Sequence, residues 1–410
     1  MSRPATAQDA APASPAAAPS VALTNLRILD LTRVRAGPTC CRIFADFGAD
    51  VIKIEAPDGI DPNETMSGAR DGYDMLNLHR NKRSLTLNLK RKEGLAVFLK
   101  LVETADVVVE NYRPDVKTRL GIDYEALKAR NPRIILASIS GFGQDGPYAK
   151  RAGFDQIAQG MGGLMWITGI PGQGPVRAGA AVADSTAGLY AATGILVALR
   201  ERDVSGLGQW VQTSLLQSQI ALCDFQAARY LIEGEVPPQN GNDHPYSTPM
   251  GVVETADGFI NLAVGGDGQW RDLCTAIQRS DLAHHPDYAT QPQRLAHRAD
   301  VWALLTPIFA ADTSASWLER LEAVGVPAGP IYRMDEVFAD PQVAHLNVAQ
   351  SVPHPRRGEV TLVGQPIGLS RTPAAVVAPL ADKGADCDAI LADVGFDSAE
   401  IAALRAEGVI

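Results

Sequence analysis

The sequence contains few cysteines and no long run of apolar residues. Its five cysteines are an odd number, widely scattered, and include no C-x-x-C pair, which argues against a disulfide framework and against a zinc knuckle. The longest stretch without charge, residues 156–176, carries six glycines and two prolines and would not cross a bilayer as a helix. No secretory cleavage pattern opens the chain. We therefore expect a soluble, cytoplasmic protein without a membrane partner.

The motifs of several enzyme classes are also missing. The seven histidines show neither H-x-x-x-H nor H-E-x-x-H spacing, and the chain has no G-x-S-x-G elbow. The turn at residues 32–38 holds one glycine followed by proline instead of G-x-G-x-x-G. These absences argue against metal-dependent hydrolysis, serine hydrolysis and nicotinamide-dependent dehydrogenation. We expect neither a metal nor a permanently bound cofactor.

The composition is that of a globular protein. With 410 residues, 46% of them apolar and 20% charged, the chain is long enough for two or three domains of roughly 150 residues each. Its net charge of −10 argues against nucleic acid as the partner. The first twenty residues hold eight alanines and four prolines, from which we expect a disordered tail over residues 1–20.

One part of this acidic chain is basic. Residues 79–133 hold thirteen Lys and Arg against seven Asp and Glu, a local excess of six positive charges. Such an excess could hold an anionic ligand. A solvated surface of mixed charge has the same composition, so both interpretations stay open on composition alone.

Short apolar strands alternate with helices over the first part of the chain. Strands are expected at residues 26–31 and 51–55, with a helix that starts at a proline over residues 38–47 between them. The pattern repeats with helical segments at 93–104, near Arg113 and near Tyr124, and strands at 106–110 and 133–138. Repeated units of this kind predict an α/β fold of the Rossmann type, a mostly parallel sheet covered by helices on both faces.

The second half of the chain predicts a smaller domain. A glycine-rich loop over residues 140–181 precedes a helix at 185–200, a strand at 210–213 and a long helix at 215–231. Gly234 and the Pro237-Pro238 pair then break regular structure. We expect a large domain with discontinuous ends, residues 21–234 and 340–410, and a small α+β domain. The small domain would cover residues 235–339, with strands around Val252 and at 259–264.

Two charged residues stand in positions that suit chemistry. Asp184 lies among small residues in AGAAVADSTAG, residues 178–188, so a bulky ligand could approach its carboxylate closely. An Asp before Ser-Thr-Ala is also typical of a helix N-cap, and the two roles are compatible. Arg35 follows the first expected strand, at the end where ligands of such sheets bind, although a surface arginine fits this position as well. A carboxylate nucleophile beside a basic phosphate-binding region is the most economical chemistry.

At these residues the chain resembles the class III coenzyme A transferase family, the group that contains formyl-CoA transferase, carnitine CoA-transferase and succinyl-CoA:glutarate CoA-transferase. The resemblance covers nearly everything after the tail and rests on blocks that are highly specific in this order. The blocks are LRILDLTRVRAGP, GADVIKIEAP, HRNKRSLTLNLK, DVVVENYRP, PRIILASISGFGQDGPYAKRAGFD, AVADSTAGLYAATGILVAL and VGVPAGPI.

The resemblance implies a fold, a substrate pair and a site. The fold would be a Rossmann-type large domain with a smaller domain, in two chains that interlock as a homodimer. The substrates would be an acyl-CoA and a carboxylic acid, with Asp184 as the catalytic nucleophile. The family's contacts to coenzyme A fall on Arg35, Ala36, Ala56, Leu87, Lys90, Asn111, Tyr112, Arg113, Arg119, Arg151 and Phe154. Many of these residues lie in the basic stretch.

Two departures from formyl-CoA transferase bear on the substrate. That enzyme has a glutamine where this chain has Arg35, and it has a longer glycine-rich loop over the site. The nearest analogue of the loop here is GGDG at residues 265–268, in which Gly265 and Gly266 are candidate oxyanion donors. The segments RAGFDQ, GLMWITG and FADPQVAH are closer to the glutarate and succinate branch. We therefore expect a short dicarboxylic acid, with succinyl-CoA as the donor.

Two other functions stay open. The α-methylacyl-CoA racemase looks similar over the same blocks, but racemisation needs a proton-carrying histidine in its GHD block. Here that block reads Gly153-Phe154-Asp155, and phenylalanine carries no proton. The other alternative is a non-catalytic acyl-CoA binding protein in which Asp184 is only a helix cap.

Overall fold

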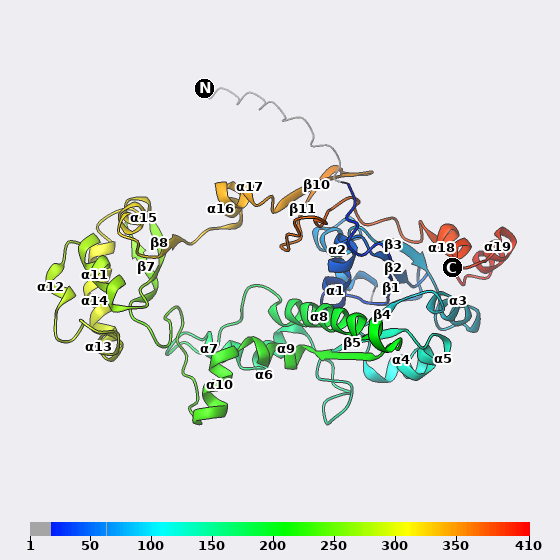
Figure 1. Ribbon diagram of the computed structural model, residues 1–410, viewed down its shortest axis with the longest axis horizontal. Coiled ribbons are helices and arrows are strands. Elements are labelled where there is room, and N and C mark those ends of the chain that lie inside the picture. Colours follow the sequence, from blue (N-terminus) through cyan, green and yellow to red (C-terminus); the bar gives the residue numbers. More distant parts are fainter. Residues whose placement is uncertain (1–17, 63) are drawn as a thin grey trace, which may run out of the picture. The chain divides into compact units, whose positions relative to one another are not determined.

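The computed structural model describes residues 18–62 and 64–410, and the chain divides into two compact units (Figure 1). The first unit comprises the described residues up to Ala158, Ala181–Leu222 and Leu346–Ile410, and the second comprises Gln159–Ala180 and Cys223–His345. Residues 1–17 of the expected tail lie outside the described part of the chain, whereas Ser20 is buried. The domain boundaries expected from the sequence stay a prediction.

A six-stranded parallel sheet lies at the centre of the first unit, which confirms the expected α/β fold. Its strand order is β3-β2-β1-β4-β5-β6, with β2 on one side of β1 and β4 on the other. The winding of the chain therefore reverses between β1 and β4. Strand β3 was not predicted, because RSLT is short and mostly polar. The strands are β1 Arg27–Asp30, β2 Asp50–Glu55, β3 Arg83–Thr86, β4 Val107–Glu110, β5 Ile135–Ser140 and β6 Trp210–Ser214.

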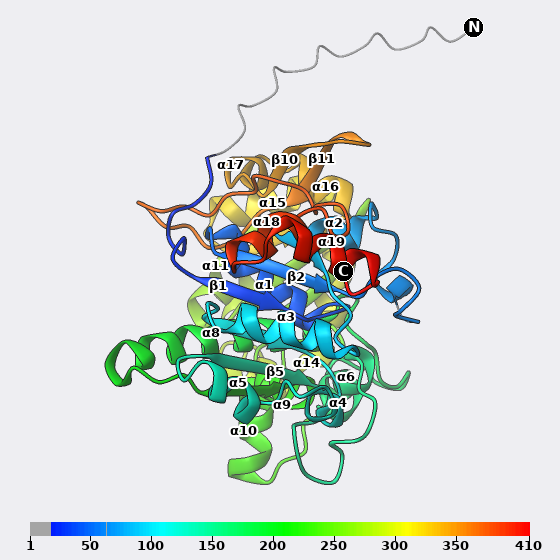
Figure 2. The same ribbon diagram turned by 90° about the vertical axis from the view of Figure 1, so that its right-hand side faces the viewer.

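Helices cover both faces of this sheet (Figures 1 and 2). Successive side chains of β4 point to opposite faces of the sheet and enter two separate apolar clusters. Val107 and Val109 belong to the first cluster, and Val108 belongs to the second. Helices α1 and α8 pack in the first cluster, and α3, α18 and α19 pack in the second. The helices of this unit are α1 Ala36–Asp46, α2 Tyr73–His79, α3 Lys92–Val102, α4 Pro114–Leu120, α5 Tyr124–Arg130, α8 Val182–Ser205, α9 Leu215–Leu222, α18 Cys387–Asp393 and α19 Ser398–Ala406.

Short elements complete the first unit. The segment Glu64–Ser67 forms a 3-10 helix between β2 and α2. Strands β10 Ala349–His354 and β11 Gly358–Val363 pair as an antiparallel hairpin. Helix α6 Asp155–Met161 begins in this unit and continues into the second. All five cysteines lie in the described part of the chain, where they are buried and form no disulfide.

The second unit is built on a three-stranded antiparallel sheet. Its apolar core centres on Trp270, Leu305 and Trp317. Strand β8 lies between β7 and β9, and five helices connect β8 to β9. Its elements are α7 Leu164–Ile167, α10 Asp224–Glu233, β7 Met250–Thr255, β8 Gly258–Ala263, α11 Asp267–Ala276, α12 Ser280–Ala283, α13 Gln291–Ala296, α14 Arg298–Phe309, α15 Ser314–Ala323, β9 Ala328–Pro330, α16 Met334–Ala339 and α17 Pro341–His345.

Three expectations about helices differ in detail from the structure. The segment expected as one helix over residues 215–231 forms α9 and α10, because Asp224 has a φ of 42°, outside the right-handed helical region. The segment expected as a loop over residues 140–181 contains the short helices α6 and α7. Helix α8 begins three residues before the expected start at Ser185, and Gly206 ends it in the left-handed conformation.

Helix α8 is unusually apolar. By length and composition it could cross a bilayer, a test that the core helix of a soluble protein also passes. One of its faces, with Ala187, Ala191 and Ile195, is buried in the first apolar cluster. Other apolar side chains of the helix, such as Leu189 and Val197, are exposed. Because one side of the helix is buried, α8 is a core helix of the first unit. Its second apolar face is left uncovered in the single chain.

Close packing between α1 and α8 depends on Gly188. A Cβ atom at this position would lie 2.6 Å from the Ala36 carbonyl oxygen and 2.9 Å from Thr39 Cβ. Both neighbours belong to the first turns of α1, so they move only if that helix moves. The absence of a side chain at Gly188 therefore lets the N-terminal turns of α1 and α8 lie against each other, with Arg35 at the start of one and Asp184 at the start of the other.

We expect Gly188→Ala to lower the free energy of unfolding by about 1–3 kcal/mol, although alanine is the better helix former, because the added methyl group overpacks the contact. Urea denaturation measures the change. The matched control is Gly268→Ala in α11, where an added Cβ meets no atom within 4 Å. The control should be as stable as the wild type or slightly more so. Equal stabilities of the two variants would contradict the role of Gly188.

Candidate active site

The residues expected to contact coenzyme A lie at one edge of the parallel sheet. Loops that follow the carboxyl ends of parallel strands meet at the same edge, where ligands of such folds bind. The structure brings residues from five neighbouring strands to this edge, although they are far apart in sequence. Arg35 and Ala36 follow β1, Ala56 follows β2, Leu87 and Lys90 follow β3, Asn111, Tyr112 and Arg113 follow β4, and Arg151 and Phe154 lie in the loop after β5. Arg119 lies one turn beyond these, on α4.

Four cations at this edge are accessible, but two predicted contact residues, Ala36 and Leu87, have buried side chains. Lys90, Arg113, Arg119 and Arg151 are exposed. Arg113 and Arg119 both form ion pairs with Asp115, at N···O distances of 3.4 and 3.5 Å. Exposed ion pairs of this kind are weak, so a phosphate could replace Asp115 as the partner. The side chain of Leu87 is 2% exposed and belongs to the apolar core, so only its backbone could meet a ligand.

Asn111 joins the loops after β1 and β4, where the winding of the sheet reverses. Its Oδ1 accepts from the backbone N–H of Arg33 at 3.0 Å, and its Nδ2 donates to the Arg33 carbonyl oxygen at 2.7 Å. The next residue, Val34, has a φ of 63°, which is strained for a β-branched side chain. Strain of this kind persists only where neighbours fix the backbone, and it concentrates at functional sites. Asn111 therefore holds the turn that carries Arg35.

A buried ion pair at the end of β1 fixes the same turn. Asp30 Oδ1 accepts from the backbone N–H of Thr32 at 2.9 Å and from its hydroxyl at 2.5 Å, and Lys82 Nζ donates to Asp30 Oδ2 at 2.8 Å. Burial raises the pKa of Asp30, but Lys82 and the neighbouring Lys53 outweigh it, so the pKa is lowered and the carboxylate stays ionised. A Cβ at Gly37 would lie 2.3 Å from Thr32, so the glycine of this motif is needed to admit Thr32.

Asp184 lies in the first turn of α8 and is not its N-cap, so the interpretation as a cap is wrong. The helix begins at Val182, its N-cap is Ala181, and Asp184 is the third helical residue. The cap is supplied by Asp155, whose Oδ1 accepts from the backbone N–H of Ala183 at 2.9 Å and of Asp184 at 3.4 Å. This role of Asp155 could not be predicted from the sequence, because the two carboxylates are 29 residues apart and only the fold brings them together.

The surroundings of Asp184 make its carboxyl group more basic than usual. Burial and the neighbouring Asp155 raise its pKa from 3.8 to about 6, and Arg35 opposes this shift. Within the described residues the Asp184 carboxylate accepts no hydrogen bond. At neutral pH such a group is still roughly 90% ionised, since one pH unit changes the ratio of the two forms tenfold. The result is a half-buried, unusually basic carboxylate.

Arg35 is held by a partner that the sequence did not reveal. Its Nη2 donates to both oxygens of Asp74, at 2.8 and 2.9 Å, from the N-terminal turn of α2. Arg35 therefore faces two carboxylates, Asp74 in direct contact and Asp184 at longer range. Among the described residues only Asp74 forms an ion pair with Arg35, and this pair fixes the guanidinium beside the catalytic candidate.

Gly265 and Gly266 belong to the second unit. Gly265 precedes α11, and Gly266 is the N-cap of that helix. The backbone N–H of Gly265 donates to Gln269 Oε1 at 2.8 Å, so this donor already has an acceptor. The proposed role of the two glycines as oxyanion donors stays a prediction.

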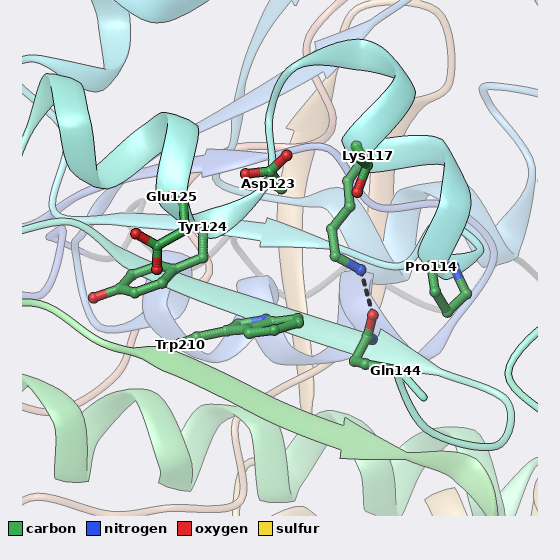
Figure 3. A pocket seen from close by; sticks show the side chains of 8 residues that line it. Pro114, Lys117, Asp123, Tyr124, Glu125, Gln144 and Trp210 are labelled. Carbon is green, nitrogen blue, oxygen red and sulfur yellow. Dashed lines mark hydrogen bonds between the residues drawn. The ribbon is translucent and has the colours of Figure 1, made fainter. Parts of the chain in front are cut away.

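A cavity of about 260 Å³ lies between α4, α5 and Trp210 (Figure 3). The ammonium group of Lys117 enters it 5.4 Å from the centre of the Trp210 ring and donates to Gln144. Glu110 lies 3.5 Å from this ammonium group and balances its charge, and Asp123 and Glu125 also line the cavity. The cavity is therefore unsuited to a phosphate group. Across residues 18–62 and 64–410, no three His, Cys, Asp or Glu side chains gather as metal ligands.

We expect Asp184→Asn to be more stable than the wild type at about pH 8 but not at about pH 4. The folded-state pKa of Asp184, about 6, exceeds its ordinary value of 3.8, so the folded state binds the proton more tightly than the unfolded state does. As the pH rises from about 4 to about 6, ionisation of Asp184 therefore lowers the free energy of unfolding of the wild type, and asparagine avoids this loss. The gain should be on the order of 1–2 kcal/mol in urea denaturation. An equal gain at both pH values would show that the carboxylate's charge is not its cause.

The chain is similar to known proteins over most of its length. Residues 23–386 match the model of CoA-transferase family III. The succinate–glutarate CoA-transferase of Agrobacterium fabrum is 40% identical over 381 residues, which cover 91% of this chain and 95% of that protein. The succinyl-CoA:mesaconate CoA-transferase of Haloarcula hispanica is 38% identical over 362 residues, which cover 86% and 91%.

A solved structure agrees with these matches. The crystal structure of a CAIB/BAIF family protein from Brucella suis superposes with a TM-score of 0.80 at 36% sequence identity, over 92% of this chain and 100% of that one. The resemblance that the ordered sequence blocks indicated is thereby confirmed. The chain belongs to CoA-transferase family III.

Proposed function

We propose that this CoA-transferase moves coenzyme A reversibly from succinyl-CoA to a short dicarboxylic acid, with Asp184 as the covalent nucleophile. The observation that carries the proposal is the Asp184 carboxylate, which is half-buried, accepts no hydrogen bond in the described residues and has a pKa raised to about 6. A carboxylate placed in this way costs stability and holds no described group through a hydrogen bond. The names of the relatives from Agrobacterium fabrum and Haloarcula hispanica, which refer to succinate, glutarate and mesaconate, support the choice of acids.

In the first half of the proposed reaction the enzyme takes up coenzyme A. The Asp184 carboxylate attacks the thioester carbonyl of the donor, the carbon–sulfur bond breaks, and CoA leaves as a thiolate from a mixed anhydride. The thiolate then attacks the aspartyl carbonyl and expels the donor acid as its carboxylate. Asp184 now carries coenzyme A as a thioester. Covalent catalysis of this kind divides one difficult exchange into easier acyl transfers.

The second half reverses these steps with the acceptor acid. The acceptor carboxylate attacks the aspartyl thioester, which releases the thiolate and forms a second anhydride. The thiolate attacks the acceptor's carbonyl, which gives the new acyl-CoA and restores the Asp184 carboxylate. One thioester replaces another, so the exchange needs no ATP.

The two alternative functions are less well supported. A racemase needs a proton-carrying group at position 154, and Phe154 is an exposed phenylalanine at the start of α6. A purely binding protein would use Asp184 only as a helix cap, but Asp155 serves as the cap. Both observations favour Asp184 as a reacting group.

We extend the proposal to an interlocked homodimer, which the family resemblance implies. Helix α8 supports it, because Leu189, Leu196, Val197 and Val204 form an exposed apolar surface on a helix whose other face is buried in the core. Large apolar side chains exposed together on one helix face are typical of an interaction site. A second copy of the chain would cover this apolar surface, and the resulting interface would help to keep water from the anhydride. The cytoplasmic location expected from the sequence stays a prediction.

The direct test of the mechanism is to trap the intermediate. Wild-type enzyme incubated with succinyl-CoA and no acceptor, then treated with hydroxylamine, should carry a hydroxamate at Asp184 in peptide mapping by mass spectrometry. Asp184→Asn keeps the size of the side chain but removes the anionic nucleophile, so transfer should fall by several orders of magnitude while CoA binding is kept. Substantial transfer by this variant, or labelling of another carboxylate such as Asp155, would refute the assigned mechanism.

We expect Arg35 to select acids with a second carboxylate, because a guanidinium binds a carboxylate through strong charge-assisted hydrogen bonds. In Arg35→Ala, the ratio of kcat/KM for succinate to that for butyrate should fall by about tenfold. The ratio isolates the selectivity, since any change in the Asp184 pKa affects both acids alike. The companion variant Asp74→Asn removes the charge that Arg35 now faces, and its ratio should be equal to the wild-type ratio or higher. If Arg35→Ala leaves the ratio unchanged, Arg35 does not meet the acid.

A further inference from the structure

Helix α8 begins without a cap of its own. The first turn of any helix leaves backbone N–H groups without partners inside the helix, and a Ser, Thr, Asp or Asn at the N-cap usually accepts from them. The N-cap of α8 is Ala181, whose methyl group accepts nothing. The backbone N–H groups of Ala183 and Asp184 instead donate to Asp155 Oδ1, from the first residue of α6.

We propose that Asp155 is a positioning residue for the reaction: it caps α8 from outside the helix and thereby fixes the backbone from which the Asp184 carboxylate projects. This inference rests on the proposed function, in which Asp184 is the nucleophile. One of the two N–H groups that Asp155 holds belongs to Asp184 itself, at 3.4 Å. The hydrogen bond to Asp155 holds the backbone nitrogen of Asp184, the atom bonded to its Cα. This contact therefore sets the direction of the Cα–Cβ bond of Asp184.

The fold places Asp155 firmly enough for this role. The loop after β5 leaves the strand at Gly141 and returns to the same place at Gly153, where a Cβ on either glycine would lie within 2.8 Å of the other's Cα. Asp155 follows two residues later and is 9% exposed. The close approach of the two glycines thus anchors the start of α6 beside the end of β5, and Asp155 with it.

The charge of Asp155 has a second effect on Asp184. Two carboxylates near each other resist ionising together, so Asp155 raises the proton affinity of Asp184. Arg35, at the start of α1, acts in the opposite direction and is itself paired with Asp74 of α2. These are the charged groups that face Asp184 from the elements packed around it. Asp155 consequently raises the pH at which Asp184 becomes a carboxylate.

Two substitutions separate the cap from the charge. Asp155→Asn keeps an oxygen that accepts from the two N–H groups, since asparagine is as good a cap as aspartate, but it removes the charge. Asp155→Ala removes both. The matched control is Asp397→Ala, because Asp397 Oδ1 likewise accepts from two backbone N–H groups, those of Ala399 and Glu400 at the start of α19. It removes a cap of the same kind outside the candidate site.

The experiment measures kcat/KM for succinyl-CoA and an acceptor acid from about pH 5 to about pH 9, together with the Kd of CoA and the melting temperature. Asp155→Asn should keep transfer near pH 8 within about fivefold of the wild type, with the acid limb of the profile moved to lower pH by about half a unit or more. Asp155→Ala should lose transfer by about 100-fold while it binds CoA normally, because a small misplacement of a reacting group is costly. Asp397→Ala should lose thermal stability but keep the wild-type profile.

Several results would overturn the inference. One is an Asp155→Ala enzyme as active as Asp397→Ala, and another is an Asp155→Asn enzyme whose acid limb does not move. If Asp155→Ala does not fold, the profile of Asp155→Asn decides alone. Asp184→Asn, run in parallel, separates this inference from the proposed function. Transfer by Asp184→Asn refutes the mechanism itself, whereas an inactive Asp184→Asn beside unaffected Asp155 variants refutes only the role of Asp155.

Discussion

The contact of α1 with α8 at Gly188 is the constraint on which the rest of the site depends. Because no side chain separates the two helices there, the second turn of α8 lies against the carbonyl oxygen of Ala36. Both helix starts lie at the carboxyl edge of the parallel sheet, where neighbouring loops already gather cations. A carboxylate at the start of α8 is therefore placed within reach of Arg35 and of anything bound along that edge.

The start of α8 bears an unusual combination of charges. Two carboxylates, Asp155 and Asp184, lie near each other, which is unfavourable in a half-buried place. The partial positive charge of a helix N-terminus offsets part of this repulsion, and Arg35 offsets more. The division of labour follows from the contacts: Asp155 accepts the backbone N–H groups, and Asp184 accepts none in the described residues. One carboxylate is used to hold the structure, which leaves the other for chemistry.

The sequence predicted those features that depend on local patterns. The apolar runs of β1 and β4 identified the parallel sheet, and the parallel strands in turn predicted that residues as far apart as Arg35 and Arg151 share one edge. Features that depend on contacts between distant residues were not predictable. The Asp155 cap and the Arg35–Asp74 pair join segments 29 and 39 residues apart. Local spacing even favoured the wrong cap, because Asp184 before Ser and Thr has the sequence of an N-cap while the helix starts two residues earlier.

The raised pKa of Asp184 biases the collapse of the mixed anhydride. In the mixed anhydride the CoA thiolate meets two carbonyl groups. Attack on the acyl carbonyl expels Asp184 and returns the starting thioester, whereas attack on the aspartyl carbonyl expels the substrate acid and moves coenzyme A onto the enzyme. Ordinary carboxylic acids ionise near pH 4, about two units below Asp184, so the substrate carboxylate is the better leaving group. The same burial that destabilises the ionised Asp184 thus favours loading of coenzyme A onto the enzyme in the first half of the reaction, whereas in the second half, where Asp184 itself must leave, it opposes the productive collapse.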